Sequence, residues 1–497
     1  MSTWSSSMEQ RFKEQPTLLT PSAGNQSCCI CRAPRSLVQF NEKAFQPQIV
    51  SIGPYHHGKE RLNMVEQHKP RFFSALIERT KDGGVGLDHY FTAVASKENE
   101  IRDCYSEFLP CESKALIEMM VLDACFIVEV FRIFGRVIWS NWDDPIFTTQ
   151  WIFPFLIKDL LQIENQIPFS VLQVVFDLSK GDIADKATTP SLNELALGFF
   201  NSAFQRPQEQ LEKFFRVFNV KHLLDLFRLS FIGHTEVEQP ANVYVDYQQL
   251  IPSATQLLLS GINCMPRNDC NLNLLDVQFN HGILQIPPLT LDDCMSSFLL
   301  NCVAFEQSFN YSSRHLSSYI IFMRCLVSTE KGAELLSENR ILLNYLGSNA
   351  EVATFFNDLS MGITIDISTS YLAAIFGQVN RYHEMFLPRT RRILYDLRVL
   401  FSPEVTDPRA TQFWEDMNCG AGGSTLKVLE DLSTATSFLV NNANALVFHF
   451  GFVYHLSVSN FMSLKEIVIT AQIYWLGTGF GPMDTVKSYV DQVQISH

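Results

Sequence analysis

The sequence contains few charged residues and no excess of positive charge. Lys, Arg, Asp and Glu make up 18% of its 497 residues, and 38 basic against 52 acidic side chains give a formal net charge of −14. Binding to a phosphate backbone depends on many Lys and Arg contacts, so this composition argues against nucleic acid as a partner. The one basic cluster, RTRRILYDLR at 389–398, is interpreted as a solvated helix face.

Familiar catalytic and metal-binding signatures are also missing. The sequence has no GxSxG motif of serine hydrolases, no phosphate-binding loop with Lys before Ser or Thr, and no set of protein-kinase motifs. It also has neither the HExxH motif nor the paired CxxC motifs of zinc sites. Two glycine-rich phrases, CGAGGSTLK and GTGFG, lack the spacing of nucleotide-binding loops. We therefore expect no cofactor and no metal.

The first thirty residues lack an apolar segment of signal-peptide length, so secretion is not expected. The 12 Cys residues are spread along the chain without a compact disulfide framework. Both observations predict an intracellular protein with reduced thiols.

Apolar residues are plentiful, at 46%, and include 40 Phe residues that we expect in the core. The prediction is a mainly α protein: a large helical body with a small antiparallel β element around residues 256–286. Helices are predicted over 63–80, 113–134, 154–178 with a break at Pro168, 195–204, 209–218, 222–228, 292–309 and 319–346, and strands over 256–264, 274–279 and 282–286.

Composition divides the chain into four parts. A polar, disordered segment over 1–28 precedes a helical domain over 29–400, a linker over 401–431 and a hydrophobic tail over 432–497. Residues 432–464 contain no charged side chain and are long enough to span a bilayer, yet several Asn and His residues interrupt them. A spanning helix and a buried or interfacial segment both remain open.

Three acidic residues occupy positions where apolar residues are expected. Asp123 has Met119, Met120, Phe126 and Ile127 as its helical neighbours. Glu164 lies between Leu160 and Ile167, and Glu306 lies beside Cys302, Val303 and Phe309. Such acids must find hydrogen bonds or keep their protons.

These acids allow two interpretations. Asp123, Glu164 or Glu306 could act as the general acid or base of an enzyme in an internal cavity. The favoured interpretation is a structural network that holds loops such as the one at Asn165 and Gln166.

The phrase SIGPYHHG at 51–58 predicts a dense turn, with Pro54, Tyr55, His56 and His57 as structural residues. A metal site from these histidines with His68 and Glu66 is not favoured, because adjacent His side chains diverge in extended backbone. We expect Tyr55 and one His to pack against the following helix.

Several long phrases occur in a characteristic order: ICRAP, SIGPYHHG, ESKAL, ENQIPF, HLLDL, PSATQL, GILQIPPL and AFEQ. Over residues 30–350 they resemble the plant domain-of-unknown-function 247 family, also called uncharacterised protein family 0481. The resemblance implies a helical, intracellular plant protein that ends in a hydrophobic anchor, with no established catalytic residues. After Val379 the sequence departs from the family pattern, so its tail is either a degenerate anchor or a product of altered splicing or gene assembly.

Some members of that family are implicated in self-incompatibility between pollen and stigma in grasses. The resemblance therefore implies a role in recognition or signalling, with an unidentified protein partner and membrane contact through the tail. Together with the missing catalytic motifs, it favours a noncatalytic interaction protein over an enzyme.

Overall fold

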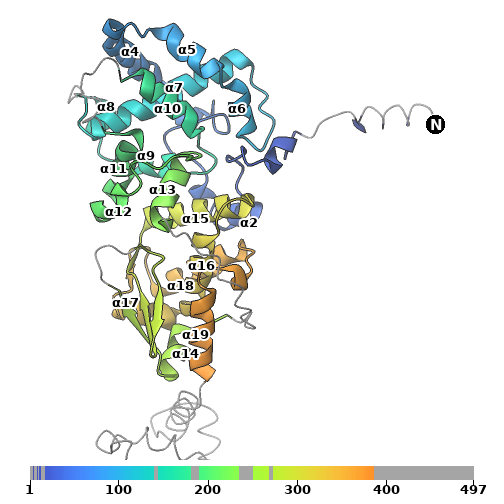
Figure 1. The fold of residues 1–497 in the computed structure, drawn as a ribbon, viewed down its shortest axis with the longest axis vertical. Coiled ribbons are helices and arrows are strands. Elements are labelled where there is room, and N and C mark those ends of the chain that lie inside the picture. The colour runs from blue at the N-terminus through green and yellow to red at the C-terminus, as the bar shows by residue number, and fades with distance from the viewer. Residues whose placement is uncertain are drawn as a thin grey trace, which may run out of the picture. The chain divides into compact units, whose positions relative to one another are not determined.

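A computed structural model describes residues 17–138, 144–180, 190–233, 250–267 and 273–384, together with positions 4, 8, 11 and 12. The described chain is mainly helical with a few short strands, as predicted (Figure 1). Its contacts form two compact units, residues 1–255 with 264–377 and residues 256–263 with 378–497. The linker and tail predicted over 401–431 and 432–497 lie outside the described residues.

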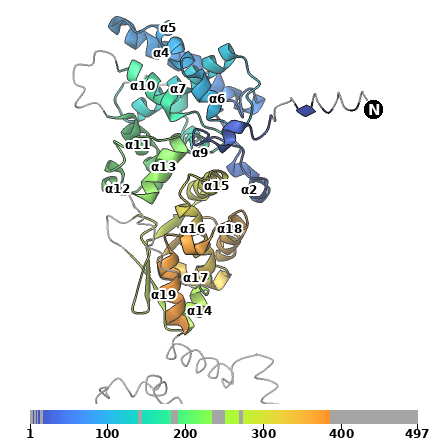
Figure 2. The same cartoon turned by 45° about the vertical axis from the view of Figure 1, so that its right-hand side comes forward.

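The first group of helices contains the long helix α7. In chain order it comprises α2 (Arg35–Phe40), α3 (Asn63–Glu66), α4 (Lys69–Thr80), α5 (Leu87–Ala95), α6 (Glu98–Asp103), α7 (Ser113–Phe134), α8 (Pro145–Thr148), α9 (Ile152–Leu160), α10 (Phe169–Leu178), α11 (Leu192–Phe204), α12 (Gln208–Glu212) and α13 (Leu223–Ile232). Helix α7 packs against α4, α5, α10 and α11, and Figures 1 and 2 both show these helices around it. It contains neither Gly nor Pro and is buried over most of its length, as the sequence predicted.

The second group combines helices with two small sheets. It comprises α14 (Ala254–Leu259), β1 (Asn263–Pro266), β2 (Gln278–Asn280), β3 (Ile283–Ile286), β4 (Leu289–Leu291), α15 (Asp293–Ser308), α16 (His315–Leu326), α17 (Glu330–Glu338), β5 (Leu342–Asn344), α18 (Asn349–Met361) and α19 (Ala373–Glu384). Short 3-10 turns are η1 (Pro21–Gly24), η2 (Glu42–Ala44), η3 (Glu60–Leu62), η4 (Lys81–Gly83) and η5 (Ile367–Thr369). Helix α15 contacts α9, α11 and α13 of the first group as well as α16.

The predicted antiparallel element is present as a hairpin. Strands β2 and β3 pair antiparallel, with Asn280 opposite Ile283, and β1 lies on the other side of β3. The two turn residues, His281 and Gly282, have φ of 49° and 81°, as a two-residue hairpin turn requires. A second sheet, in which β4 and β5 pair in parallel, was not predicted.

Several predicted elements were wrong. The helix predicted over 209–218 ends at Glu212, and the strand predicted over 274–279 begins only at Gln278. The strand predicted over 256–264 is helix α14 up to Leu259 and strand β1 only from Asn263, because its short apolar run fits a helix face that buries Ala254 and Leu257. The helix over 319–346 is two helices followed by β5. Thr329 caps α17 by accepting a hydrogen bond from the Gly332 amide, and a Cβ on Gly332 would lie 2.5 Å from the Leu326 carbonyl oxygen.

Phenylalanine forms much of the core, as predicted. Ring centroids lie 5.0 Å apart for Phe131 and Phe199, 5.3 Å for Phe200 and Phe227, and 5.1 Å for Phe227 and Phe298. These contacts join α7, α11, α13 and α15 through aromatic pairs in tilted or edge-on geometry.

The chain near the N-terminus contacts the helical body. The amide of Thr20 donates to the Ser106 carbonyl at 2.9 Å, and the Phe108 amide donates to the Thr17 carbonyl at 2.9 Å. Part of the segment over 1–28 that the sequence predicted to be disordered is therefore bound. Among the described residues, no helix combines the length and apolarity needed to cross a bilayer.

Candidate functional site

The SIGPYHHG phrase forms a turn between the extended chain before it and η3. Gly53 has φ of 71°, in the left-handed region that favours glycine. A Cβ at this position would lie 2.6 Å from the Gln166 carbonyl oxygen and 2.9 Å from the Tyr105 hydroxyl. Only a glycine therefore fits where the turn meets the ENQIPF loop.

Asp123 projects from α7 onto this turn. Its Oδ2 accepts a 2.7 Å hydrogen bond from the Gly53 amide, and its Oδ1 accepts one from Lys69 Nζ. Burial raises the pKa of Asp123, and the positive charge of Lys69 opposes that rise.

Lys69, at the start of α4, is the cation of this network. Its side chain is 0% exposed, and Nζ also donates to the Ser51 carbonyl at 2.5 Å and to Glu66 Oε2 at 2.6 Å. Three acceptors thus satisfy the three donors of a buried ammonium group. No local pattern around Lys69 predicted that its side chain would be buried.

Asp159 binds the chain just before the turn and was not predicted. Its carboxylate accepts hydrogen bonds from the amides of Gln48, Ile49 and Val50 at 2.7–3.0 Å. Asp159 lies in the last turn of α9, where the helix dipole disfavours an acid. An acid in the last turn of a predicted helix was the one feature of the sequence that could have indicated specific partners for Asp159.

The stability that Asp159 confers is expected to fall as the pH rises. Burial raises its pKa from 3.8 to about 6, although the three amides oppose the rise. At a pH between these two pKa values, Asp159 keeps a proton in the folded chain that it has released in the unfolded chain. Its contribution to the free energy of unfolding is therefore complete below about pH 4 and is lost as the pH rises through about 6. The loss in the free energy of unfolding should be about 3 kcal/mol. Free energies of unfolding of wild type and Asp159→Asn, measured from pH 4 to 7, test this; parallel curves would contradict it.

Glu164 joins the turn to the ICRAP segment. Its carboxylate accepts hydrogen bonds from the Ala33 amide at 2.9 Å and from Arg32 Nη1 at 3.0 Å, and lies 3.4 Å from His56 Nε2. Burial works against ionisation, but His56, the Ala33 amide and Arg32 together hold the pKa of Glu164 below its usual range. Burial lowers the pKa of His56.

Asn165 and Gln166 hold the turn from the other side. Asn165 Oδ1 accepts from the Ile52 amide at 2.7 Å, and its Nδ2 donates to the Val50 carbonyl at 3.1 Å. Gln166 Nε2 donates to the Leu160 carbonyl at 2.7 Å, and the Gln166 carbonyl accepts from the Tyr105 hydroxyl at 3.0 Å. The structure therefore brings two phrases of the sequence, SIGPYHHG and ENQIPF, into direct contact.

The remaining residues of the predicted motif lie along the same turn. Pro54 occupies the turn itself. The Tyr55 ring meets the Tyr105 ring edge-on at 5.5 Å, and the Arg32 guanidinium lies 4.3 Å from its centroid on the ring face. His57 is half-exposed and lies 3.8 Å from Glu66. Among the described residues, no group of three His, Cys, Asp or Glu side chains is placed to hold a metal ion.

Glu306 belongs to a separate network. This fully buried acid on α15 accepts from Arg228 Nε at 3.0 Å and from the Ser317 amide and hydroxyl at 2.8 and 2.7 Å. Arg228, on α13, also donates to the hydroxyl of Ser313 at 2.8 Å. This network links α13 and α15 to the start of α16, where the helix dipole favours a negative charge.

The ICRAP segment is held by residues that are distant in sequence. The amides of Cys29 and Ile30 both donate to the Cys104 carbonyl at 2.9 Å. The Tyr311 hydroxyl donates to the Cys28 carbonyl at 2.6 Å, and His222 Nε2 lies 3.0 Å from the Cys29 carbonyl oxygen. Burial lowers the pKa of His222 to about 4, so this ring is neutral and its Nε2 carries the proton.

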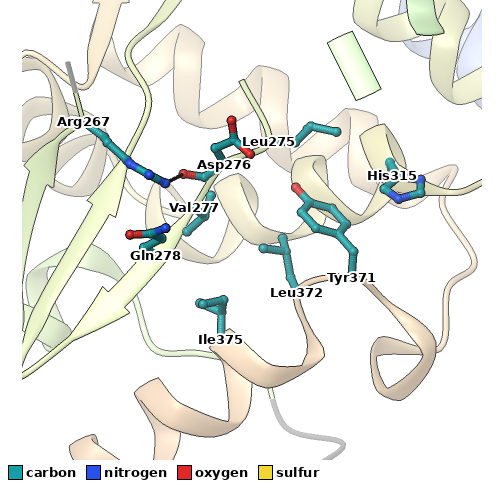
Figure 3. Close-up of a pocket in the computed structure, with 9 residues that line it drawn as sticks. All are labelled: Arg267, Leu275, Asp276, Val277, Gln278, His315, Tyr371, Leu372 and Ile375. Atoms are coloured by element: carbon teal, nitrogen blue, oxygen red, sulfur yellow. Dashed lines mark hydrogen bonds between the residues drawn. The ribbon is translucent and has the colours of Figure 1, made fainter. Parts of the chain in front are cut away.

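The three predicted acids are thus not brought together at one open site. Asp123 and Glu164 both contact the SIGPYHHG turn, whereas Glu306 lies with Arg228. Their oxygens accept hydrogen bonds from amides and cations of the protein itself. A pocket of about 170 Å³ exists elsewhere in the described chain, and none of the three lines it (Figure 3).

Comparison of the sequence with known proteins identifies its family. The model of DUF247, described as a plant protein of unknown function, matches residues 30–402. A UPF0481 protein of Arabidopsis thaliana is 39% identical over 388 residues, which cover 74% of this chain and 80% of that protein. A putative UPF0481 protein of Arabidopsis thaliana is 20% identical over 441 residues, 71% of this chain and 82% of that protein. No solved structure matches the chain. The chain therefore belongs to the DUF247 family of plant proteins, also named UPF0481.

Proposed function

We propose that this chain is a noncatalytic interaction protein that acts in recognition or signalling inside plant cells. One observation carries the proposal: the buried carboxylates are occupied by structural donors. Asp123, Glu164 and Glu306 each accept at least two hydrogen bonds, several of them from backbone amides. A general acid or base must instead reach the reacting group of a substrate.

The helical surface supports the same proposal by exposing large aromatic side chains. Trp151 is 51% exposed and Phe155 is 36% exposed, and their ring centroids lie 6.1 Å apart at the start of α9. Tryptophan and phenylalanine on a surface are typical of protein interfaces, where they fill apolar pockets of a partner. The net charge of −14 favours a partner of positive charge.

Affinity capture with the purified full chain tests this function. We expect extracts of plant tissue to yield a reproducible, salt-sensitive set of proteins on the wild-type chain. The Trp151→Ala/Phe155→Ala variant should lose this set. Met361→Ala should keep it, because Met361 is 80% exposed on a different helix, α18.

The alternative is an enzyme of plant specialised metabolism. Incubation of the same chain with plant metabolites compares wild type with Glu164→Gln. If wild type consumes a metabolite and Glu164→Gln does not, catalysis replaces the proposed role. A capture experiment that retains no reproducible proteins, or the same proteins with all variants, also contradicts the proposal.

We also propose that the chain is intracellular and contacts a membrane through residues 432–497. The support is the uncharged stretch over 432–464, which has the length of a bilayer span. A fluorescent reporter fused to residues 432–497 should then pellet with membranes, while the reporter alone stays in solution. A fusion that stays in solution would leave a cytoplasmic location in its place.

A further inference from the structure

The pocket of about 170 Å³ lies between the hairpin sheet and the loop that leads into α19. Leu275 and Val277 line it beside β2, and Leu372 and Ile375 line it from the start of α19. Figure 3 shows these side chains around the hollow, with Tyr371 and His315 on the remaining side. Its walls are thus mainly apolar, with a few polar groups.

Two polar side chains of this pocket lack partners among the described residues. The hydroxyl of Tyr371 is buried and makes no hydrogen bond, and neither ring nitrogen of His315 makes one. Their rings stack with centroids 5.2 Å apart and an interplanar angle of 29°. Figure 3 shows the Tyr371 hydroxyl pointing toward Leu275 and Asp276. A buried hydroxyl without a partner is unfavourable, so such a group calls for a ligand or a water.

The charges at the pocket balance. Arg267 donates to the Asp276 carbonyl at 2.9 Å, and the Asp276 carboxylate accepts from the Asn273 amide at 2.7 Å. Among the described residues that line the pocket, one cation and one anion leave no net charge to attract an ion. Burial lowers the pKa of His315 to about 4, so its ring is neutral near pH 7 and offers one donor and one acceptor.

We propose that this pocket binds a small uncharged molecule that carries a hydroxyl group on an apolar body, such as a benzylic alcohol or a phenol. A hydroxyl both donates and accepts, so it pairs with Tyr371 in either role and with either nitrogen of a neutral His315. A water molecule needs about 10–15 Å³, so the pocket has room for more than water. It is smaller than the sites of about 300–1,000 Å³ that hold drug-sized ligands.

Three probes of one ring size test the proposal on the full chain. Benzyl alcohol carries the hydroxyl, toluene lacks it and benzoate carries a charge. We expect benzyl alcohol to bind at least about tenfold more tightly than toluene or benzoate in titrations followed by ligand-observed NMR. Equal binding of benzyl alcohol and toluene would show that the pocket does not recognise the hydroxyl, and no binding of benzyl alcohol would leave water as the occupant; either result would overturn the proposal.

Matched variants assign the binding to this pocket. Tyr371→Phe removes only the hydroxyl and should reduce the affinity for benzyl alcohol to that for toluene. Tyr319→Phe is the control, because the Tyr319 hydroxyl is also buried without a partner but does not line the pocket. Ile375→Phe should weaken all probes by filling the hollow. Unchanged binding in Ile375→Phe, or equal effects of Tyr371→Phe and Tyr319→Phe, would contradict the assignment. If a variant fails to fold, the comparison of the three probes on the wild-type chain still tests the proposal.

Discussion

Replacing Lys69 with Met is expected to lower the free energy of unfolding by about 3–5 kcal/mol. Lys69 is fully buried and neutralises Asp123, which is 1% exposed in α7. Methionine matches the apolar length of lysine but brings no charge, so the variant leaves the Asp123 carboxylate buried without its cation. Urea denaturation of both proteins measures the difference.

The surface pair of Lys97 and Glu100 is the control for this prediction. Lys97 is 29% exposed and Glu100 is 49% exposed, and such pairs contribute about 1 kcal/mol or less. Lys97→Met should therefore change the stability little. In Lys69→Met/Asp123→Asn no buried charge remains unpaired, so this double variant should be more stable than Lys69→Met alone. A loss below about 1 kcal/mol for Lys69→Met would show that the network is not needed for stability.

Replacing Arg228 with Met should also cost about 3–5 kcal/mol, because it leaves the fully buried Glu306 without its cation. The same change removes the contacts of Arg228 with Ser313, so the start of α16 should loosen as well. Thermal unfolding and amide hydrogen exchange of α16 measure the two effects.

Arg102 is the matched control for Arg228. It pairs with Glu98 on α6, where the two side chains are 28% and 23% exposed. Arg102 also donates to the carbonyls of Leu109 and Cys111, so Arg102→Met should cost some stability but less than Arg228→Met. If Arg102→Met and Arg228→Met destabilise equally, burial of the pair is not the cause of the effect. Adding Glu306→Gln to Arg228→Met should recover part of the loss, because the buried charge is then removed.

The long helices could be predicted from the sequence because their signals are local. The stretch 113–134 has no Gly or Pro and became α7 with those bounds. The region 319–346 could not be divided correctly, because the break at Thr329 depends on a cap and on a contact between Gly332 and Leu326. The strand β5 then forms by pairing with β4, about fifty residues earlier in the chain, which no local pattern predicts.

The burial of Asp123 and Glu164 could likewise be read from their apolar neighbours. Their partners could not, since Gly53 lies 70 residues before Asp123 and Ala33 lies 131 residues before Glu164. Asp159 has more mixed helical neighbours and was missed for that reason. The periodicity of apolar residues thus indicates which face of a helix is buried. The hydrogen-bond partners of an acid on that face depend on which distant loops pack against it.

The attachment of the ICRAP segment has a consequence for synthesis on the ribosome. The Cys28 carbonyl receives its hydrogen bond from Tyr311, 283 residues later. At a translation rate of about 5–20 residues per second, that partner emerges roughly 15–60 s after the cysteine. The ICRAP segment can therefore bind the Cys104 carbonyl early in synthesis, whereas its hydrogen bond to Tyr311 can form only after the chain beyond α15 has emerged.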